Sequence, residues 1–316
     1  MDMEIELVIC KSSHGTHQRD ALYKELCNAD YFILEFFCSS ILEKKLDANN
    51  PLYKTYIPAI RIIEAYEKAK AVNKKLKIID DVEAEKFFLS QFERIDELES
   101  EARKILYGMA YIISLTSGYN GYKTEQKTLL AKIKAYAESL IALEDKFCDI
   151  LIKKLKEIQR EKKKVKIVID SGYIHQYHKL KNINALEKAL NANISLEEKV
   201  EKAMLKGFFE ELVIDYMQGK LKEENLEEYS EKIAKAVLFE AIYSPSSFEI
   251  HPFPGIIDRE KQEAIYKQYF PKVQKWGEKE LKKFWYAYQS LILESPLNPY
   301  SNYEDMEKIL KRAGLN

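Results

Sequence analysis

The 316-residue chain contains few of the residues that interrupt helices or form cross-links: it has 10 glycines, 8 prolines and 4 cysteines. Scarce glycine and proline favour long regular helices. The cysteines, at positions 10, 27, 38 and 148, form no Cys-x-x-Cys motif. The first residues also lack the basic start and the long apolar run of a secretory signal. We therefore expect reduced thiols in a soluble, cytoplasmic protein.

Long apolar runs and an excess of one charge are absent as well. No apolar stretch reaches the roughly 18 residues that a membrane span needs. Lysine and arginine together number 50 and aspartate and glutamate 51, which gives a net charge of −1. Such a balance provides no overall attraction for nucleic acid or anionic membranes, and we expect neither as a partner. Glycine-rich nucleotide loops, the Gly-x-Ser-x-Gly turn and the His-Glu-x-x-His zinc motif are also missing.

Short apolar runs alternate with helical patterns through the first part of the chain. Strands are expected over Glu4–Cys10, Asp30–Phe37, Leu76–Ile79 and Val165–Ile169. Helices over Gln18–Cys27 and from Asn50 to about Asn73 separate the first three strands. This order is typical of a parallel α/β sheet, because a parallel strand pair needs a crossover between its members.

Helical periodicity dominates the remainder. It covers Val82–Ile113 and Thr124–Gln159, and after Asn182 it continues to the end of the chain. The later helices are expected over Ala185–Leu190, Leu196–Met217, Glu224–Ile242, Arg259–Phe270, Lys272–Glu294 and Tyr303–Ala313. The sequence thus predicts an α/β fold with a mainly parallel central sheet, in which residues 1–183 form the core with a helical insertion at about 82–160. Residues 184–316 are expected to form a helical C-terminal region.

Four of the five histidines form two matched pairs. His14 and His17 follow the first predicted strand, and His175 and His178 follow the fourth, both with i, i+3 spacing. Ligand sites in open parallel sheets lie beyond the carboxyl ends of the strands. Imidazole suits both proton transfer near neutral pH and metal ligation. We therefore expect His14 and His175 to share one cavity, while His17 and His178 individually fit an ordinary structural role.

Other polar residues occupy the same strand ends. Lys11 ends the first strand, Asp80 and Asp81 follow the third, and Asp170 follows the fourth. Glu35 lies within an otherwise apolar strand, where a carboxylate is costly unless it is paired. The aspartates alternatively cap the helices that follow them. Glu35 is the strongest candidate of this set for a functional role.

Two mechanisms fit these residues. In one, His14, Glu35 and His175 ligate a divalent metal such as Zn, Mn or Co, which lowers the pKa of bound water. In the other, a histidine held by a carboxylate acts as a general base on water without a metal. A proline-rich stretch at residues 244–255 carries the fifth histidine, His251. This stretch is a candidate lid over the pocket and equally a plain connector.

The motifs resemble those of the TraB superfamily, which includes pheromone-shutdown proteins, Tiki-type metalloproteases, erythromycin esterases and ChaN-like haem-binding proteins. The segments that carry the resemblance are VICKSSHGTH, ADYFILEF, LKIIDD, ALEDKFCDILIKKL and VKIVIDSGYIH, within about residues 4–180. The intact Gly172-Tyr173-Ile174-His175 matches the family's second Gly-x-x-His motif. The resemblance implies a hydrolytic pocket with His14, Glu35 and His175 as its core.

Three positions depart from the family pattern. Lys11 replaces the glycine of the first Gly-x-x-His motif, and Asp81 replaces the arginine expected after the Ile-Asp step. In the helix motif Glu144-Asp145-Lys146, the arginine is replaced by Lys146. These departures put the hydrolytic activity that the resemblance implies in question.

Three functional hypotheses follow. The first is a hydrolase of an ester or amide bond in a small molecule or peptide, with catalytic residues His14, Glu35 and His175. The second is a non-catalytic peptide- or protein-binding member that kept the fold, as the lysines at positions 11 and 146 suggest. The third is a haem or metal carrier. Supporting roles are expected for Lys11, His17, Asp80, Lys146, Asp170 and His178.

Overall fold

A computed structural model describes residues 3–12, 19–39, 42, 57–112, 125–158, 163–201, 207–238, 268–294 and 303–315. Within these residues the chain divides into two compact units. The first comprises residues 1–93 and 139–205, and the second comprises residues 94–138 and 206–316. The division expected from the sequence was at residue 183, whereas the boundary of the first unit lies after residue 205 and this unit takes in only part of each long helix.

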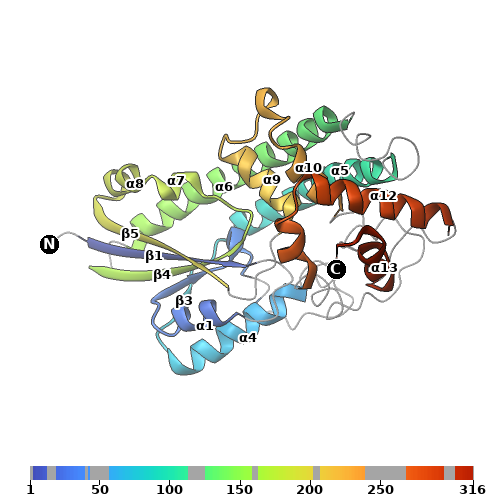
Figure 1. Ribbon diagram of the computed structural model, residues 1–316. Helices are drawn as coiled ribbons and strands as arrows, with labels where there is room; N and C mark the ends of the chain where they lie inside the picture. The colour runs from blue at the N-terminus through green and yellow to red at the C-terminus, as the bar shows by residue number, and fades with distance from the viewer. Residues whose placement is uncertain are drawn as a thin grey trace. The chain divides into compact units, whose positions relative to one another are not determined.

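The first unit is built on a five-stranded parallel sheet with the order β3-β2-β4-β1-β5 (Figure 1). Its strands are β1 (Met3–Ser12), β2 (Tyr31–Ile33), β3 (Lys77–Ile78), β4 (Lys164–Gly172) and β5 (Ala192–Val200). The parallel α/β fold expected from the sequence is therefore confirmed. The middle residues of the central strands, 7–10 in β1 and 167–169 in β4, are apolar and buried on both faces, as parallel strands covered on both sides require.

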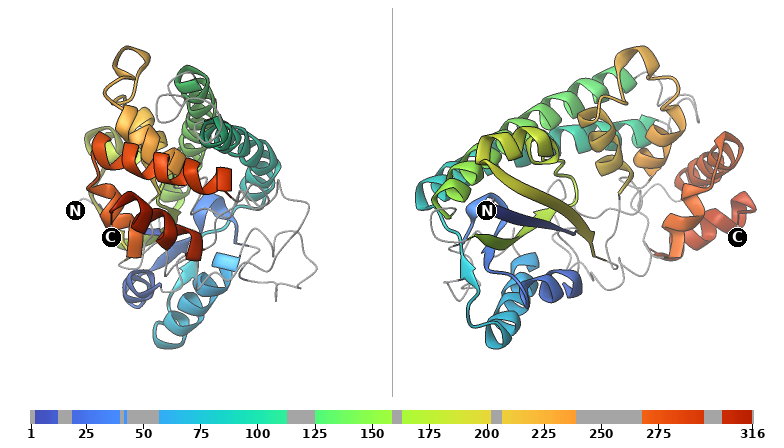
Figure 2. Two further views of the ribbon diagram at one scale, coloured as in Figure 1. Left: turned by 45° about the vertical axis from the view of Figure 1, so that its right-hand side comes forward. Right: turned by 90° about the vertical axis from the view of Figure 1, so that its left-hand side faces the viewer.

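Helices cover both faces of the sheet (Figures 1 and 2). On one face lie α1 (Asp20–Leu26) and α4 (Ile57–Val72). Their apolar side chains join the even-numbered positions of the strands in a buried cluster that includes Val8, Leu22, Phe32, Ala69 and Val168. On the other face lie the later part of α6 (Gln126–Ile158), α7 (His178–Lys181) and α8 (Ile183–Leu190).

The register of β1 and β4 decides what meets at the carboxyl edge of the sheet. Ile9 lies opposite Ile169, and Ser12 lies opposite Gly172. The backbone N–H of Tyr173 donates to the Ser12 carbonyl at 2.8 Å, which continues this pairing beyond the strands. The two strand ends that precede the histidine pairs are thus direct neighbours, which is the arrangement that a shared cavity requires.

The second unit is helical in the residues described. It contains the later part of α5 (Val82–Ile112) and the earlier part of α6. Its other elements are α9 (Phe208–Met217), η4 (Glu223–Asn225), α10 (Ser230–Leu238), a helix at 268–274, α12 (Glu278–Glu294) and α13 (Tyr303–Ala313). Among the described helices of both units, none combines the length and apolarity that crossing a membrane requires.

Three expected elements differ from the structure. The helix predicted to begin at Glu224 begins at Ser230 as α10, after the 3-10 turn η4. The helix predicted over Leu196–Met217 is wrong at its start, where β5 pairs with β1 instead. Its glutamates and lysine suggested a helix, but tertiary pairing overrides local propensity in an edge strand whose inward positions Ala192 and Ile194 are buried. The strand predicted over Asp30–Phe37 is shorter, because β2 ends at Ile33 and the 3-10 turn η1 (Glu35–Phe37) follows it.

Candidate functional site

His175 lies between two carboxylates at the carboxyl edge of the sheet. Its Nε2 is 2.7 Å from Glu35 Oε1, and its Nδ1 is 3.0 Å from Glu144 Oε1. The three residues come from distant parts of the chain: the 3-10 turn η1 after β2, the helix α6 and the turn after β4. Both ring nitrogens are therefore engaged with glutamate oxygens, which fixes the plane of the imidazole.

The turn after β4 brings His175 to this position. The His175 backbone N–H donates to the Gly172 carbonyl at 3.3 Å, which closes the turn. The Lys11 ammonium donates to the His175 carbonyl at 2.8 Å and pairs with Glu198 at 3.0 Å. Lys11 therefore has a structural role at the site. It connects the turn that carries His175 to β1 and, through Glu198, to β5.

Glu35 is placed by an unusual backbone. Phe36 and Phe37, which follow it, have φ values of 51° and 59°, a left-handed conformation that bulky residues rarely adopt. Glu35 Oε1 also accepts the Gly172 backbone N–H at 2.9 Å. Its side chain is 18% exposed, compared with 5% for His175 and 2% for Glu144. Of the three groups, Glu35 is therefore the one that water or a substrate can reach best.

Glu144 is held by three donors from a single turn. Besides the His175 ring, its Oε1 faces the Gln176 backbone N–H at 3.1 Å, and its Oε2 accepts the Tyr177 backbone N–H at 2.8 Å. Tyr177 has φ 45°, and its hydroxyl lies 3.1 Å from Ser171 Oγ. These bonds compensate the burial of the Glu144 carboxylate, which would otherwise be costly.

The two carboxylates determine the charge of the histidine. Burial alone would lower the pKa of His175, but the charge of Glu35 and the hydrogen bonds to Glu144 and Glu35 outweigh it and raise the pKa to about 10. His175 is therefore an imidazolium at neutral pH, and both its nitrogens are donors. In this state it is a proton donor rather than a general base.

Aromatic rings pack around the His175 imidazole. The Phe36 ring meets the His175 ring edge to face with centroids 5.0 Å apart, and Tyr177 lies 5.8 Å from it. Phe36 in turn packs on Phe88 and Phe147 at 5.0 and 5.8 Å. Such apolar surroundings lower the local dielectric constant and strengthen the interaction of the charged groups.

Asp170 is close to His175 in the sequence, but its side chain lies on the opposite face of the sheet, which α1 covers. It forms a buried ion pair with Arg19, the residue before α1. Beside this pair, the buried Glu201 accepts the backbone N–H groups of Ala21 and Leu22, each at 3.0 Å, and so caps α1. The structure therefore assigns Asp170 to a second polar cluster rather than to the histidine site.

The remaining predicted supporting residues in the described chain lie outside the cluster around His175. Lys146 and His178 are exposed, and the Lys146 ammonium lies 5.8 Å from the centre of the Phe87 ring. Asp80 is exposed, whereas its neighbour Asp81 accepts the Ala84 N–H at 2.9 Å. Asp81 thus caps α5, which is the alternative that the sequence left open.

His14, His17 and His251 lie outside the described residues. The meeting of the His14 and His175 rings therefore stays a prediction. The described neighbours of the His14 segment are both anchored: Ser12 pairs with Gly172, and Arg19 pairs with Asp170.

A metal ion does not fit the described residues by themselves. Only Glu35 and the Nε2 side of His175 could face one ion, whereas catalytic zinc has three protein ligands. No group of three or more histidine, cysteine, aspartate or glutamate side chains in the described part could hold a metal. Metal or haem ligation by His175 also needs an unprotonated nitrogen, and both nitrogens here face carboxylates.

Sequence reasoning named the helix motif at Glu144 but missed the role of this residue. Glu144 lies on the apolar stripe of α6 that includes Leu140, Phe147 and Leu151, all buried. A carboxylate on such a stripe is costly unless paired, and the same argument had identified Glu35. Arg19 and Glu201 gave no comparable signal, because both have charged residues around them in the sequence and neither interrupts an apolar run.

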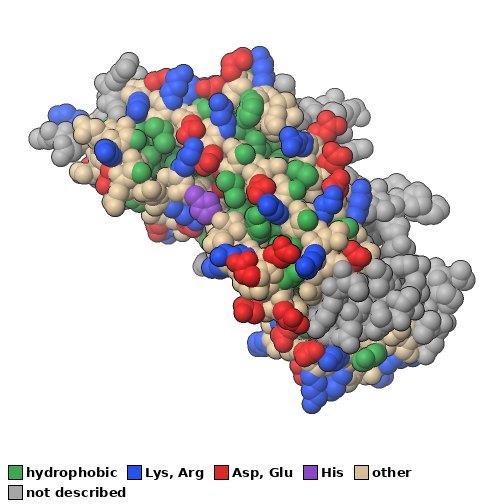
Figure 3. Space-filling view, turned by 90° about the horizontal axis from the view of Figure 1, so that it is seen from above, with side chains coloured by type: hydrophobic (Ala, Val, Ile, Leu, Met, Phe, Trp, Pro, Cys, Tyr) green, Lys and Arg blue, Asp and Glu red, His purple; other side chains and the backbone are tan. Residues whose placement is uncertain are grey.

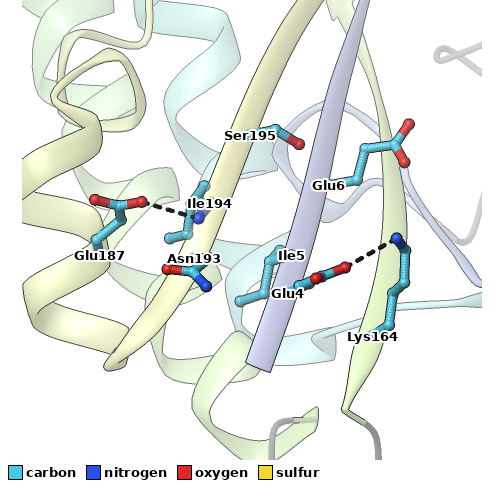
Figure 4. Close-up of a pocket in the computed structure, with 8 residues that line it drawn as sticks. All are labelled: Glu4, Ile5, Glu6, Lys164, Glu187, Asn193, Ile194 and Ser195. Carbon is cyan, nitrogen blue, oxygen red and sulfur yellow. Dashed lines mark hydrogen bonds and ion pairs between the residues drawn. The ribbon is translucent and has the colours of Figure 1, made fainter. Parts of the chain in front are cut away.

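A pocket of about 270 Å³ lies at the opposite, amino-terminal end of the strands (Figure 4). Its charged walls are already paired: Lys164 bonds Glu4 at 2.9 Å, and Glu187 accepts the Ile194 N–H at 3.1 Å. Figure 3 shows basic and acidic side chains interspersed over the face that is seen from above. Neither feature adds a residue to the histidine site.

Comparison of the chain with protein-family models, curated protein sequences and solved structures yields no match. The description of the site therefore depends on its own geometry.

Proposed function

We propose that the protein is a hydrolase of an ester or amide bond, with its catalytic centre at Glu35 and His175. The observation that carries the proposal is the 2.7 Å contact between the partly exposed Glu35 carboxylate and Nε2 of the buried His175 ring. A base that solvent can reach, joined to a proton donor behind it, is suited to general acid–base chemistry. The resemblance to the TraB superfamily supports the same reaction class.

In the proposed mechanism, Glu35 takes a proton from water as the water oxygen attacks the substrate carbonyl carbon. The proton then passes to the leaving oxygen or nitrogen as its bond to that carbon breaks, which restores the carboxylate. The Nε2–H of His175 orients Glu35 and keeps it ionised, because the imidazolium charge favours the carboxylate. His14 is the expected second imidazole of this centre.

The test is a hydrolysis assay with 4-nitrophenyl acetate, 4-nitrophenyl butyrate and a set of fluorogenic peptides. Glu35→Gln should lower kcat by about 100-fold or more, because a positioned acid–base group contributes about 10²- to 10⁴-fold. His175→Gln and His14→Ala should also lower kcat. The matched control is the exposed His178→Ala, which should keep wild-type activity. If Glu35→Gln retains full activity, the proposal is wrong.

A metal requirement is tested separately from activity. Metal content of protein purified without chelator is measured for the wild type and for His14→Ala, since a metal would need ligands beyond Glu35 and His175. If the wild type contains one metal ion per chain and His14→Ala contains none, His14 is a metal ligand and the proposed site includes a metal.

One observation favours the non-catalytic binding hypothesis. His175, Glu144 and Lys11 all have internal partners, as they would if they only held the turn after β4 against α6 and β1. In that case the wild type hydrolyses no substrate in the panel, and Glu35→Gln changes stability alone.

A further inference from the structure

We infer that Glu144 is the positioning residue of the site: through His175 it aims Nε2 at Glu35. This inference rests on the proposed function and deepens it. Glu144 does not touch the place where a substrate would bind, because its side chain is only 2% exposed and lies on the Nδ1 side of the ring. Its action on the chemistry is therefore indirect.

The geometry supports the assignment in two steps. The bond from Nδ1 to Glu144 Oε1, at 3.0 Å, sets the rotation of the ring about its own side-chain bonds. Because the two nitrogens lie on opposite sides of the ring, fixing Nδ1 also fixes the direction of Nε2. That direction leads to Glu35 Oε1 at 2.7 Å.

The same carboxylate also fixes the backbone that carries the ring. The N–H groups of Gln176 and Tyr177 bind its two oxygens at 3.1 and 2.8 Å. One side chain on α6 thus holds the ring and the two residues that follow it. A group that only filled space or capped a helix would not need to meet both the ring and its turn.

The groups that face His175 come from several elements. They are Glu35 of η1, Glu144 of α6, Lys11 of β1 through the His175 carbonyl, and the rings of Phe36 and Tyr177. Glu35 and Glu144 are the ones that contact the ring nitrogens, and they lie on opposite sides. We therefore assign the orienting role to Glu144, which is buried, and the reactive role to Glu35, which is partly exposed.

The experiment compares Glu144→Gln with Glu201→Gln. Glu201 is a matched control, since it is also buried, also binds two backbone N–H groups and lies on the opposite face of the sheet. Glu144→Gln should lower kcat by at least about 10-fold with little change in KM, as loss of an outer partner of a functional histidine does. Glu201→Gln should leave both constants unchanged per folded molecule.

Nuclear magnetic resonance of the ring protons gives a second readout that needs no substrate. In the wild type both ring N–H protons of His175 should exchange slowly, and Glu144→Gln should make the Nε2 proton exchange rapidly. If that proton stays protected, or if Glu144→Gln keeps the wild-type kcat, the positioning role is wrong. If Glu144→Gln does not fold, the wild-type spectrum decides, because an unprotonated Nδ1 overturns the inference. A wild type that hydrolyses nothing defeats the proposed function but leaves this readout intact.

Discussion

On the α6 face of the sheet's carboxyl edge a histidine lies between two glutamates, and on the α1 face an arginine is paired with an aspartate beside a third glutamate. Both clusters bury charge, and both join β4 to another segment. They differ in their cations: arginine stays protonated in proteins, whereas histidine can gain or lose a proton. They also differ in access, since Arg19 and Asp170 are each 5% exposed and Glu35 is 18% exposed.

This difference shows why burial and charge alone do not identify a reactive site. The Arg19 cluster fixes the start of α1, and its arginine does not give up a proton near neutral pH. The His175 cluster has a proton donor next to an accessible carboxylate. Four predictions test the comparison.

The largest expected effect is on the α1 face. Asp170→Asn leaves the buried Arg19 charge without its ion-pair partner, and breaking such a pair typically costs about 3–5 kcal/mol. Denaturant unfolding should show this loss, while kcat per folded molecule stays at the wild-type value. A tenfold fall in kcat would instead place Asp170 in the catalytic site and remove the distinction between the two faces.

The second prediction concerns pH and the α6 face. The pKa of His175 is about 10 in the folded protein, against 6.5 for the ordinary group. The stability that this shift contributes is fully present below the unfolded value and is lost as pH rises towards the folded value. The difference in unfolding free energy between the wild type and His175→Gln should therefore shrink steadily from about pH 6 to about pH 10. A constant difference over this range would mean that His175 is not held as a cation.

A smaller effect is expected at the end of β3. Asp81→Ala removes the cap of α5 and should destabilise the protein by about 1 kcal/mol. The neighbouring exposed Asp80→Ala should change unfolding by less than about 0.5 kcal/mol. Both variants should keep wild-type hydrolysis. Loss of activity in either one would extend the site to this strand end.

The smallest effect is expected at Lys146, where the family resemblance implies an arginine. The side chain is exposed and lies over the Phe87 ring. Lys146→Ala should cost no more than about 1 kcal/mol, the typical value of an exposed cation–π contact. Its kcat should equal that of the wild type, and a clear fall would show that this position retains the role of the missing arginine.

Much of the fold was predictable from the chain. The middle residues of β1 and β4, 7–10 and 167–169, are continuously apolar, and the sequences of α5 and α6 show long helical periodicity. β5 was missed because its Glu- and Lys-rich sequence has little intrinsic strand preference. Pairing with β1 supplies the stabilisation that the sequence of β5 lacks.

The site was predictable in part. His175 was identified by its place after a strand, and Glu35 by its cost inside an apolar run. The role of Glu144 was missed, and Asp170 was expected beside His175 although it pairs with Arg19. The side of the sheet to which a residue near a strand end points depends on exact register, and a shift of one residue reverses it.

The sequence by itself determined the parallel α/β core and the polar character of its carboxyl edge, because apolar periodicity and the position of charges within it are local properties. Only the tertiary structure decided that His175 lies between Glu35 and Glu144 while Asp170 faces Arg19. Those partners are separated by up to about 150 residues along the chain, and their hydrogen bonds depend on strand order and register, which the packing of the whole core determines.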